Sequence, residues 1–284
     1  PARDPEIGAA IRSLFIPEDN CEWGAFDYSQ QEPRLVVHYA EMMQLRGAKD
    51  AGDAFRDGDA DFHQVVADMA GIKRKQAKNI NLGLFYSMGV KKLSDSLGLT
   101  LDEGKELFSR YHERVPFVKA LSERAIRRAS DQGSIRTLLG RRCRFDKWEP
   151  SQFGTRKIMD HKTAYAEHGN AIKRAFTHKA MNRLIQGSAA DMTKKAMQLL
   201  YAEGIIPHIQ VHDELDFSIE SHEQAVRIKE IMEHCVELSV PVKVDVDLGP
   251  NWGEAKDAEK AIKHAESVRG WTRGAESDYT KQAV

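Results

Sequence analysis

The spacing of apolar residues predicts a sheet built from the two ends of the chain, with helices between them. The run from Cys21 to Asp27 is short, apolar and ends in an acid, which is typical of a buried strand. The capping-box pattern Ser29-Gln30-Gln31-Glu32 follows, and apolar residues then recur at helical spacing as far as Met43. From about residue 46 to 175 the pattern predicts helices joined by polar turns, one of them over 73–86.

Strand patterns return near the C-terminal end. Residues 208–211 and 215–219 alternate apolar and polar residues and flank His212-Asp213-Glu214, which predicts a hairpin with acids at its turn. Residues 240–248 alternate valine or leucine with proline or charged residues, as in a half-buried strand, and an amphipathic helix is predicted over 223–238. This order predicts an α+β fold in which a sheet domain is interrupted by a helical one.

Composition narrows the class of protein. The chain has 284 residues, of which 41% are apolar and 30% charged, and this balance is typical of a globular protein with two sub-domains. No apolar run approaches the roughly 20 residues of a membrane-spanning helix, and the first residues lack the apolar core of a signal peptide. The three isolated cysteines exclude a disulfide framework and suit a reducing cytoplasm.

Charge is distributed unevenly although the formal net charge is only −1. Five aspartates and one arginine lie within residues 50–61. Seven arginines and one acid lie within residues 124–144: Arg124, Arg127, Arg128, Arg136, Arg141, Arg142, Arg144 and Asp131. Such a basic stretch forms either a footprint for phosphates or an ordinary solvated helix face followed by a basic loop.

Two acids stand where the predicted sheet would bring them together. Asp27 ends the first strand, and Asp213 lies with Glu214 at the hairpin turn. Converging carboxylates repel each other unless a cation lies between them, and hard oxygen ligands favour Mg²⁺. Such a site suits two-metal phosphoryl transfer, whereas the alternative is that these acids only form turns.

The predicted helix over 73–86 carries a second candidate site. Arg74, Lys78, Leu82 and Tyr86 recur every four residues and share one slowly drifting face. Two cations followed by an apolar and an aromatic residue suit a triphosphate and a base. A solvated helix end with two core residues explains the same pattern.

These residues also carry a family resemblance. The string Asp27-Tyr28-Ser29-Gln30-Gln31-Glu32-Pro33-Arg34 resembles the first palm motif of family-A DNA polymerases, the group of bacterial DNA polymerase I and many phage replicases. The spacing Arg74-x-x-x-Lys78-x-x-Asn81-Leu82-x-x-x-Tyr86 resembles that family's fingers helix, and Val211-His212-Asp213-Glu214 resembles its second catalytic palm motif. The likeness extends from Pro1 to about Glu254, with Asn182-x-x-x-Gln186-Gly187 in the expected place.

The resemblance implies a DNA-directed DNA polymerase, a nucleotidyltransferase that joins a dNTP to the 3′-hydroxyl of a primer on a DNA template. Asp27 and Asp213 would hold two Mg²⁺ ions, for which Mn²⁺ would substitute, and the carbonyl of Tyr28 would be a further ligand. Glu214 would be an accessory catalytic acid. Lys78 would contact the triphosphate and protonate the departing pyrophosphate.

The resemblance also assigns binding residues. The dNTP pocket would include Gln30, Glu32, His63, Arg74, Lys78, Leu82 and Tyr86. The primer-template would be contacted by Arg3, Asn182, Gln186 and His212. Glu32 would crowd the sugar C2′ and reject ribonucleotides, and the capping box gives it a second role at the helix start that is compatible with the first.

The domain arrangement follows from the same likeness. It implies a palm over 1–45 and 176–254, helical fingers over 46–175, and a C-terminal tail over 255–284. Residues 147–169 resemble an insertion without a family role, while Leu82 and Asp216 depart from the family pattern, the latter replacing a usual apolar residue. The family pattern also continues upstream of Pro1 into palm, thumb and exonuclease. We therefore expect the catalytic part of a split or truncated polymerase, with a second polypeptide that supplies thumb and remaining palm, in the cytoplasm of a bacterial or phage-infected cell.

Two other classes compete with this interpretation. A non-catalytic nucleic-acid-binding subunit could retain the fold, but the presence of Asp27, Asp213, Lys78 and Arg74 together argues against it. A single-subunit RNA polymerase shares the palm layout, and Glu32 argues against that class.

Overall fold

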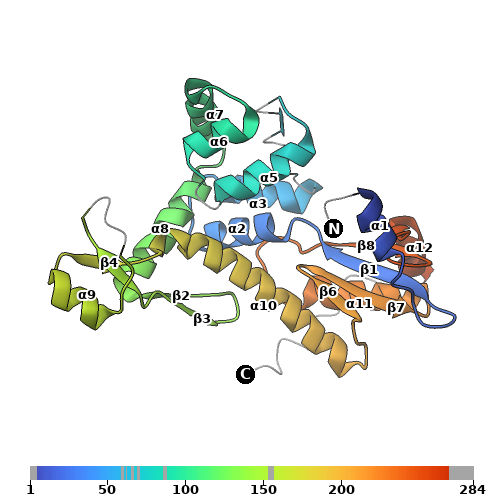
Figure 1. Cartoon of the computed structure of the whole chain (residues 1–284). Helices are drawn as coiled ribbons and strands as arrows, with labels where there is room; N and C mark the ends of the chain where they lie inside the picture. Colours follow the sequence, from blue (N-terminus) through green and yellow to red (C-terminus); the bar gives the residue numbers. More distant parts are fainter. Residues whose placement is uncertain are drawn as a thin grey trace. The chain divides into compact units, whose positions relative to one another are not determined.

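The computed structural model describes residues 5–58, 61, 63–64, 67–68, 71–85, 88–152 and 157–268 (Figure 1). The chain divides into two compact units. Unit 1 comprises residues 1–29, 196–235 and 243–284, and unit 2 comprises 30–195 and 236–242. No helix within the described ranges is long and apolar enough to cross a membrane.

Unit 1 is built on a five-stranded sheet in the order β6-β7-β1-β8-β9. The strands are β1 (Glu22–Tyr28), β6 (Ile209–Val211), β7 (Glu214–Ile219), β8 (Val244–Gly249) and β9 (Lys256–Asp257). All of the pairings are antiparallel. Helices α11 (His222–His234) and α12 (Glu259–Val268) contact strand β8, and α1 (Pro5–Arg12) precedes the sheet in sequence.

The central strand of this sheet is β1, which pairs with β7 on one side and β8 on the other. Phe26 is fully buried, and its ring meets Phe217 edge to face with centroids 5.4 Å apart. Gly24 is required by close packing, because a Cβ atom there would lie 2.5 Å from Cγ1 of Ile219. Tight packing on one face therefore fixes the register that positions the acids on the other.

The predicted strands and helices of unit 1 are confirmed with two changes of boundary. The first strand and the hairpin lie within one residue of the predicted positions, whereas the helix after them ends at His234 rather than at residue 238. The last long strand begins at Val244 rather than at Val240. Pro241 has no N–H to donate to a sheet, and its carbonyl accepts a 2.6 Å hydrogen bond from Arg34 of unit 2, to which Pro241 itself belongs.

Unit 2 is mainly helical. Its helices are α2 (Gln31–Met42), α3 (Ala48–Gly58), α5 (Arg74–Phe85), α6 (Val90–Leu97), α7 (Leu101–Arg114) and α8 (Pro116–Gln132). The 23-residue helix α10 (Ala180–Ala202) starts in this unit after the 3-10 turn η1 (Thr177–Lys179). Helix α8 contacts α2, α5 and α7, and the apolar residues Leu35, Phe85, Phe117 and Leu121 are buried there.

Residues 134–174 contain short strands that the sequence pattern did not predict. Strands β2 (Ser134–Arg136) and β3 (Arg142–Arg144) form a hairpin, and β4 (Trp148–Pro150) pairs with β5 (Ile172–Arg174). Helix α9 (His161–His168) lies between the last two. A strand of three residues is too short to show a period-2 pattern, which is why this region looked like polar turns.

Candidate functional site: an acidic sheet face and a basic helix

The acids predicted to converge lie at the same end of neighbouring strands. Asp27 is paired in register with Glu214 of β7 and with Asp245 of β8. Paired residues project from the same face of a sheet. Asp213 lies in the two-residue turn between β6 and β7, next to Glu214. Asp27 and Glu214 are therefore cross-strand neighbours, and Asp213 lies in the turn that directly precedes Glu214.

A second row of acids lies two residues further along the same face. Asp216 and Asp247 are both paired with Ala25, the second residue before Asp27 in β1. The sequence analysis did not include Asp245 or Asp247 in the site. Their alternation with valines in residues 244–248 was the available indication, but only the strand pairing shows that they share a sheet face with Asp27.

Two tryptophans hold the acids of β7. The indole N–H of Trp252 donates to Oε1 of Glu214 at 2.9 Å, and that of Trp23 donates to Oδ1 of Asp216 at 3.3 Å. The two indoles stack with centroids 6.4 Å apart. Burial raises the pKa of Glu214, and the charges of Asp213 and Asp247 raise it further. Burial and the neighbouring Glu214 raise the pKa of Asp216 to about 7.

Two further predicted residues, Tyr28 and His212, lie next to these acids in the sequence and differ in burial. The side chain of Tyr28 is buried, and its hydroxyl donates to the carbonyl of Met232 at 2.9 Å. Any role of Tyr28 as a ligand therefore belongs to its backbone carbonyl, as predicted. His212 is exposed and occupies the left-handed region with φ +59°, and its carbonyl accepts a hydrogen bond from Gln210.

The donor set suits a hard cation. Asp27 is exposed and Asp213 half-buried, so carboxylate oxygens are accessible at this strand end. Within the described ranges, no three His, Cys, Asp or Glu side chains are grouped so as to hold a metal ion. Mg²⁺ usually takes only one or two protein carboxylates and completes its shell with water and substrate phosphates. Two carboxylates and a backbone carbonyl therefore fit Mg²⁺ better than a site made of side chains alone.

Helix α5 of unit 2 carries the predicted cations. The predicted helix is confirmed over Arg74–Phe85, and Arg74 and Lys78 are both exposed one turn apart. Arg74 forms an ion pair with Asp61, which lowers the pKa of that carboxyl against the opposing effect of burial. Leu82 lies on the same helix. Its side chain, like Arg3 and Tyr86 as whole residues, falls outside the described part of the structure.

His63 is buried beside this helix rather than exposed to solvent. Only 3% of its surface is accessible, and Nδ1 lies 3.4 Å from the amide nitrogen of Asn81. The amide oxygen of Asn81 accepts a hydrogen bond from Tyr111 at 3.2 Å. Burial lowers the pKa of His63 to about 4, and the nearby Arg74 and Lys78 lower it against the effect of Asp61. The imidazole is therefore neutral at pH 7 and can act as a polar partner but not as a cation.

The start of helix α2 corrects the predicted capping box. The N-cap is Gln30, with φ +51° and no side-chain cap hydrogen bond, so the helix begins one residue later than the pattern requires. Glu32 is then the second helical residue and half-buried in the first turn. A capping box needs the acid at the third helical position, so this role of Glu32 is wrong.

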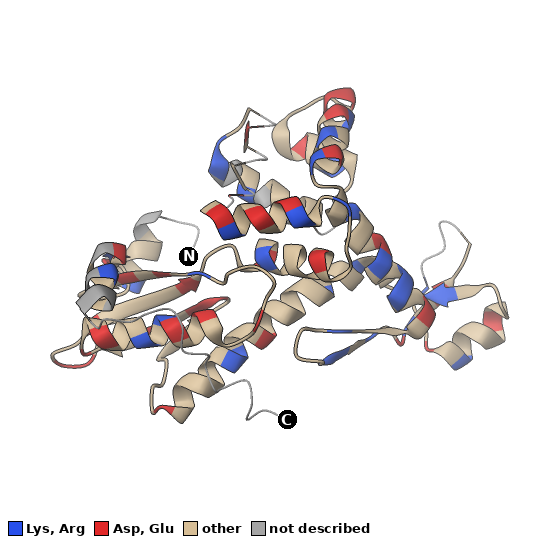
Figure 2. Ribbon diagram, turned by 180° about the vertical axis from the view of Figure 1, so that it is seen from behind, with Lys and Arg blue, Asp and Glu red and all other residues tan. Residues whose placement is uncertain are grey.

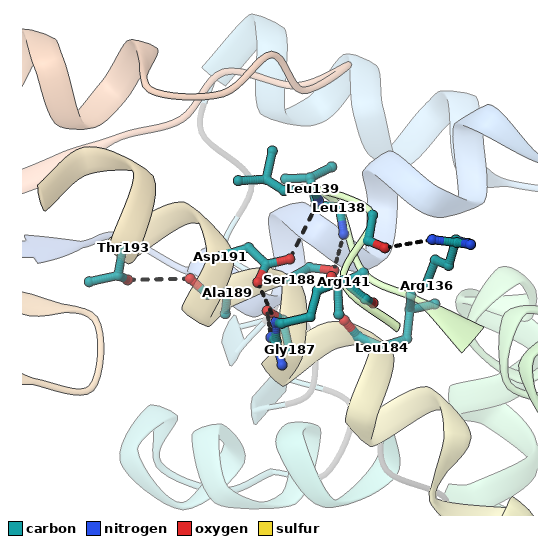
Figure 3. Close-up of polar contacts among 12 residues, drawn as sticks. Arg136, Leu138, Leu139, Arg141, Leu184, Gly187, Ser188, Ala189, Asp191 and Thr193 are labelled. Atoms are coloured by element: carbon teal, nitrogen blue, oxygen red, sulfur yellow. Dashed lines mark hydrogen bonds and ion pairs between the residues drawn. The ribbon is translucent and has the colours of Figure 1, made fainter. Parts of the chain in front are cut away.

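Helix α10 carries the two predicted amides and holds the basic hairpin. Asn182 is half-buried and Gln186 exposed, one turn apart. Figure 3 shows how the loop between β2 and β3 is fixed: Arg141 forms a 2.8 Å ion pair with the buried Asp191 and donates to the carbonyl of Gly187 at 2.7 Å. The arginine stretch therefore has mixed roles, because Arg141 is neutralised within the fold.

Comparison with known proteins identifies relatives for most of the chain. The family model described as DNA polymerase family A matches residues 1–254. A DNA-directed DNA polymerase of Pseudomonas phage M6 is 38% identical over 90% of this chain and 41% of its own length. DNA polymerase I of Bacillus subtilis is 34% identical over 88% of this chain and 28% of its own length.

A solved structure supports the same grouping. The polymerase domain of Pol1 from M. smegmatis, in complex with DNA primer-template and dNTP, matches with a TM-score of 0.68 and 29% identity. The match covers 90% of this chain and 44% of that one. The chain thus spans about two fifths or less of the length of the phage and Bacillus relatives.

Proposed function

The chain belongs to DNA polymerase family A, and from that membership we propose that it carries out template-directed DNA synthesis. Its substrates would be a DNA primer-template and dNTPs. The primer 3′-hydroxyl would attack the α-phosphate of the dNTP, forming a new phosphodiester bond and releasing pyrophosphate. The observation that carries the proposal is the register that sets Asp27 opposite Glu214 and next to the turn that holds Asp213.

The acids of unit 1 would supply the metal-binding part of the reaction. Asp27, Asp213 and the carbonyl of Tyr28 would hold two divalent ions, Mg²⁺ by the hardness of these donors. Such ions, when bound, neutralise the charge that develops on the reacting phosphate. Glu214, oriented by Trp252, would remain an accessory acid beside them.

The residues of unit 2 would bind the triphosphate. Lys78 is exposed and can donate a proton to the pyrophosphate oxygen as the bond to the α-phosphate breaks. Arg74 would exchange its carboxylate partner Asp61 for phosphate oxygens, which it can bind through two N–H groups. His63 would act as a neutral donor, or through Asn81 as a positioning group.

The remaining assignments also stay proposals. Gln30, Glu32, Leu82 and Tyr86 would line the dNTP pocket, with Glu32 excluding the ribose 2′-hydroxyl. Asn182, Gln186, His212 and Arg3 would contact the primer-template, where amides can address minor-groove acceptors without reading sequence. The division into palm, fingers and tail stays a prediction. A second polypeptide that supplies thumb and remaining palm is a further prediction, which mass measurement of the assembly purified from its source would test.

Primer extension with Asp27→Asn and Asp213→Asn tests the proposal. A neutral amide cannot hold a divalent ion against developing negative charge, so we expect each variant to lose at least ~10³-fold in rate, roughly 4 kcal/mol, while DNA binding is kept. Asp247→Asn is the matched control, because it removes an acid from the same sheet face away from Asp27.

Three results are informative. Near-normal extension by either site variant would contradict the metal assignment. A tenfold or greater loss in the Asp247→Asn control would show that total charge on the face matters more than position. DNA binding without any extension by the unaltered chain, even after addition of extract from its source, would favour the non-catalytic binding subunit.

A further inference from the structure

Residues 147–152 and 157–174 form a small substructure that the proposed reaction does not use. Strand β4 pairs with β5, and a bridge joins Trp148 to Met159. Helix α9 lies against both strands, beside the C-terminal end of α8 (Figure 1). Within the described part of the substructure, helix α9 buries only Ala164, so most of its side chains face solvent.

One cation and three aromatic rings form a row across this substructure. The guanidinium of Arg174 lies over the Trp148 ring, 4.5 Å from its centroid. The Trp148 and His161 rings are 4.7 Å apart edge to face, and His161 and Tyr165 are 6.1 Å apart with planes inclined by only 20°. The row ends at solvent, because 53% of the Tyr165 surface is exposed.

The surface around the aromatic row is positively charged, because its acids are engaged by neighbouring groups and two lysines remain. All three acids of the described part of 147–174 are engaged: Asp160 caps α9 through the amide of Thr163, Glu149 pairs with Lys173, and Glu167 pairs with Lys157. Lys147 and Lys162 are exposed, and the described residues provide neither with an ion pair. Lys162 precedes Tyr165 by three positions on α9, so the two share a face of the helix.

We propose that this aromatic row binds single-stranded DNA, with bases stacked on His161 and Tyr165 and phosphates near Lys162 and Lys147. Exposed aromatic faces interleaved with cations are the means by which proteins bind unpaired strands without reading sequence. A duplex does not offer its base faces, so the rings select single strands. The inference rests on the proposed function in one respect: the single strand is taken to be the unpaired template of a primer-template.

Direct binding tests the site without requiring catalysis. The probe is a 5′-labelled 20-nucleotide oligo(dT), titrated with the full chain and followed by fluorescence anisotropy. We expect the double variant His161→Ala/Tyr165→Ala to bind at least about fivefold more weakly, since each stacked base contributes a factor of that order. Tyr201→Ala is the matched control, because Tyr201 is an exposed tyrosine on another helix, with 70% of its surface accessible.

Salt dependence separates the cations from the rings. Lys162→Glu should reduce the slope of log affinity against log salt by about 0.7 for each lost phosphate contact, whereas the ring variant should leave the slope unchanged. The melting temperature of both variants is measured as well. It should equal that of the unaltered chain, because the substituted side chains are exposed. Wild-type affinity of the ring variant for oligo(dT), or an equal loss for a blunt duplex, would overturn the proposal.

Primer extension distinguishes this proposal from the proposed function. With a template overhang of one nucleotide the ring variant should extend at the normal rate, and with an overhang of 20 nucleotides its KM for primer-template should rise while kcat is kept. If the unaltered chain extends no primer but binds oligo(dT) through these rings, the proposed function fails and the site stands. If extension is normal and oligo(dT) binding does not depend on the rings, the single-strand site is contradicted and the proposed function stands.

Discussion

Asp216 is a buried carboxyl on the acidic face of unit 1, and its protonation should link stability to pH. Its pKa is raised from an ordinary 3.8 to about 7. Between about pH 4 and pH 7, therefore, the folded state keeps a proton on Asp216 that the unfolded state has released. Stability should therefore fall as pH rises from about 4 to 7, by at most about 4 kcal/mol at 1.4 kcal/mol per pKa unit. Asp216→Asn keeps an acceptor for Trp23 and removes this titration.

Denaturant unfolding at pH 5 and pH 8 measures the effect. The unaltered chain should lose more stability between the two pH values than the Asp216→Asn variant does. Glu214 and Asp247, whose pKa values burial also raises, should leave a smaller slope of the same sign in the variant. Equal pH dependence in both proteins would show that folded Asp216 is ionised over this range, as it is in the unfolded state, and would contradict the raised pKa.

The same residue shows what a sequence can predict of this site. Asp27, Asp213 and Glu214 are found from their positions at a strand end and a turn, because local patterns predict both. Asp216 is visible as a charged residue in an apolar strand, but its partner Trp23 lies 193 positions away and depends on strand register. Contacts that only the register creates cannot be found from local spacing.

At the scale of elements, Ser188 joins helix α10 to the β2–β3 hairpin and to α2. Its hydroxyl oxygen accepts from the amide of Leu138 at 3.0 Å and donates to the carbonyl of Leu184 (Figure 3). The same oxygen lies 2.7 Å from the hydroxyl of Tyr39. Ser188→Ala leaves two of these groups without their partner inside unit 2. We expect a loss of about 1–3 kcal/mol in the free energy of unfolding.

Thr193→Val on the same helix is the matched control. Thr193 is also buried, and its hydroxyl donates to the carbonyl of Ala189 at 3.3 Å. Its loss should cost less than about 1 kcal/mol, because that carbonyl belongs to a helix. Denaturant unfolding compares the two variants, and hydrogen exchange of the Leu138 amide should accelerate only in Ser188→Ala. An equal cost for both would show that Ser188 is an ordinary buried hydroxyl.

Helix starts show when a local capping pattern forms in the fold and when it does not. Two segments have the form Ser/Thr-x-x-Glu before a helix. Thr100 and Glu103 form a capping box, with the amide of Thr100 donating to Glu103 at 2.8 Å. At Ser29 the pattern fails, because the amide of Ser29 donates to the carbonyl of Lys243 and so continues the sheet. Tertiary pairing overrides the local preference there.

At the scale of the whole molecule, local charge rather than the net charge of −1 should govern affinity for DNA. Arg127 and Arg128 are exposed on α8, where Figure 2 shows several basic bands. Lys91 and Lys92 are exposed on α6 of the same unit. The double variants Arg127→Glu/Arg128→Glu and Lys91→Glu/Lys92→Glu change the net charge equally, which makes them a matched pair.

Affinity for a primer-template is measured by fluorescence anisotropy between 50 and 200 mM salt. It distinguishes a phosphate-binding arginine stretch from an ordinary solvated helix face. Each phosphate neutralised by the protein contributes about 0.9 to the slope of log affinity against log salt. If the arginine stretch is a phosphate footprint, the α8 variant should bind at least about tenfold more weakly and lose about 2 from the slope, while the α6 variant binds almost normally. Equal losses would mean that net charge dominates, and normal binding by the α8 variant would leave its arginines as a solvated helix face.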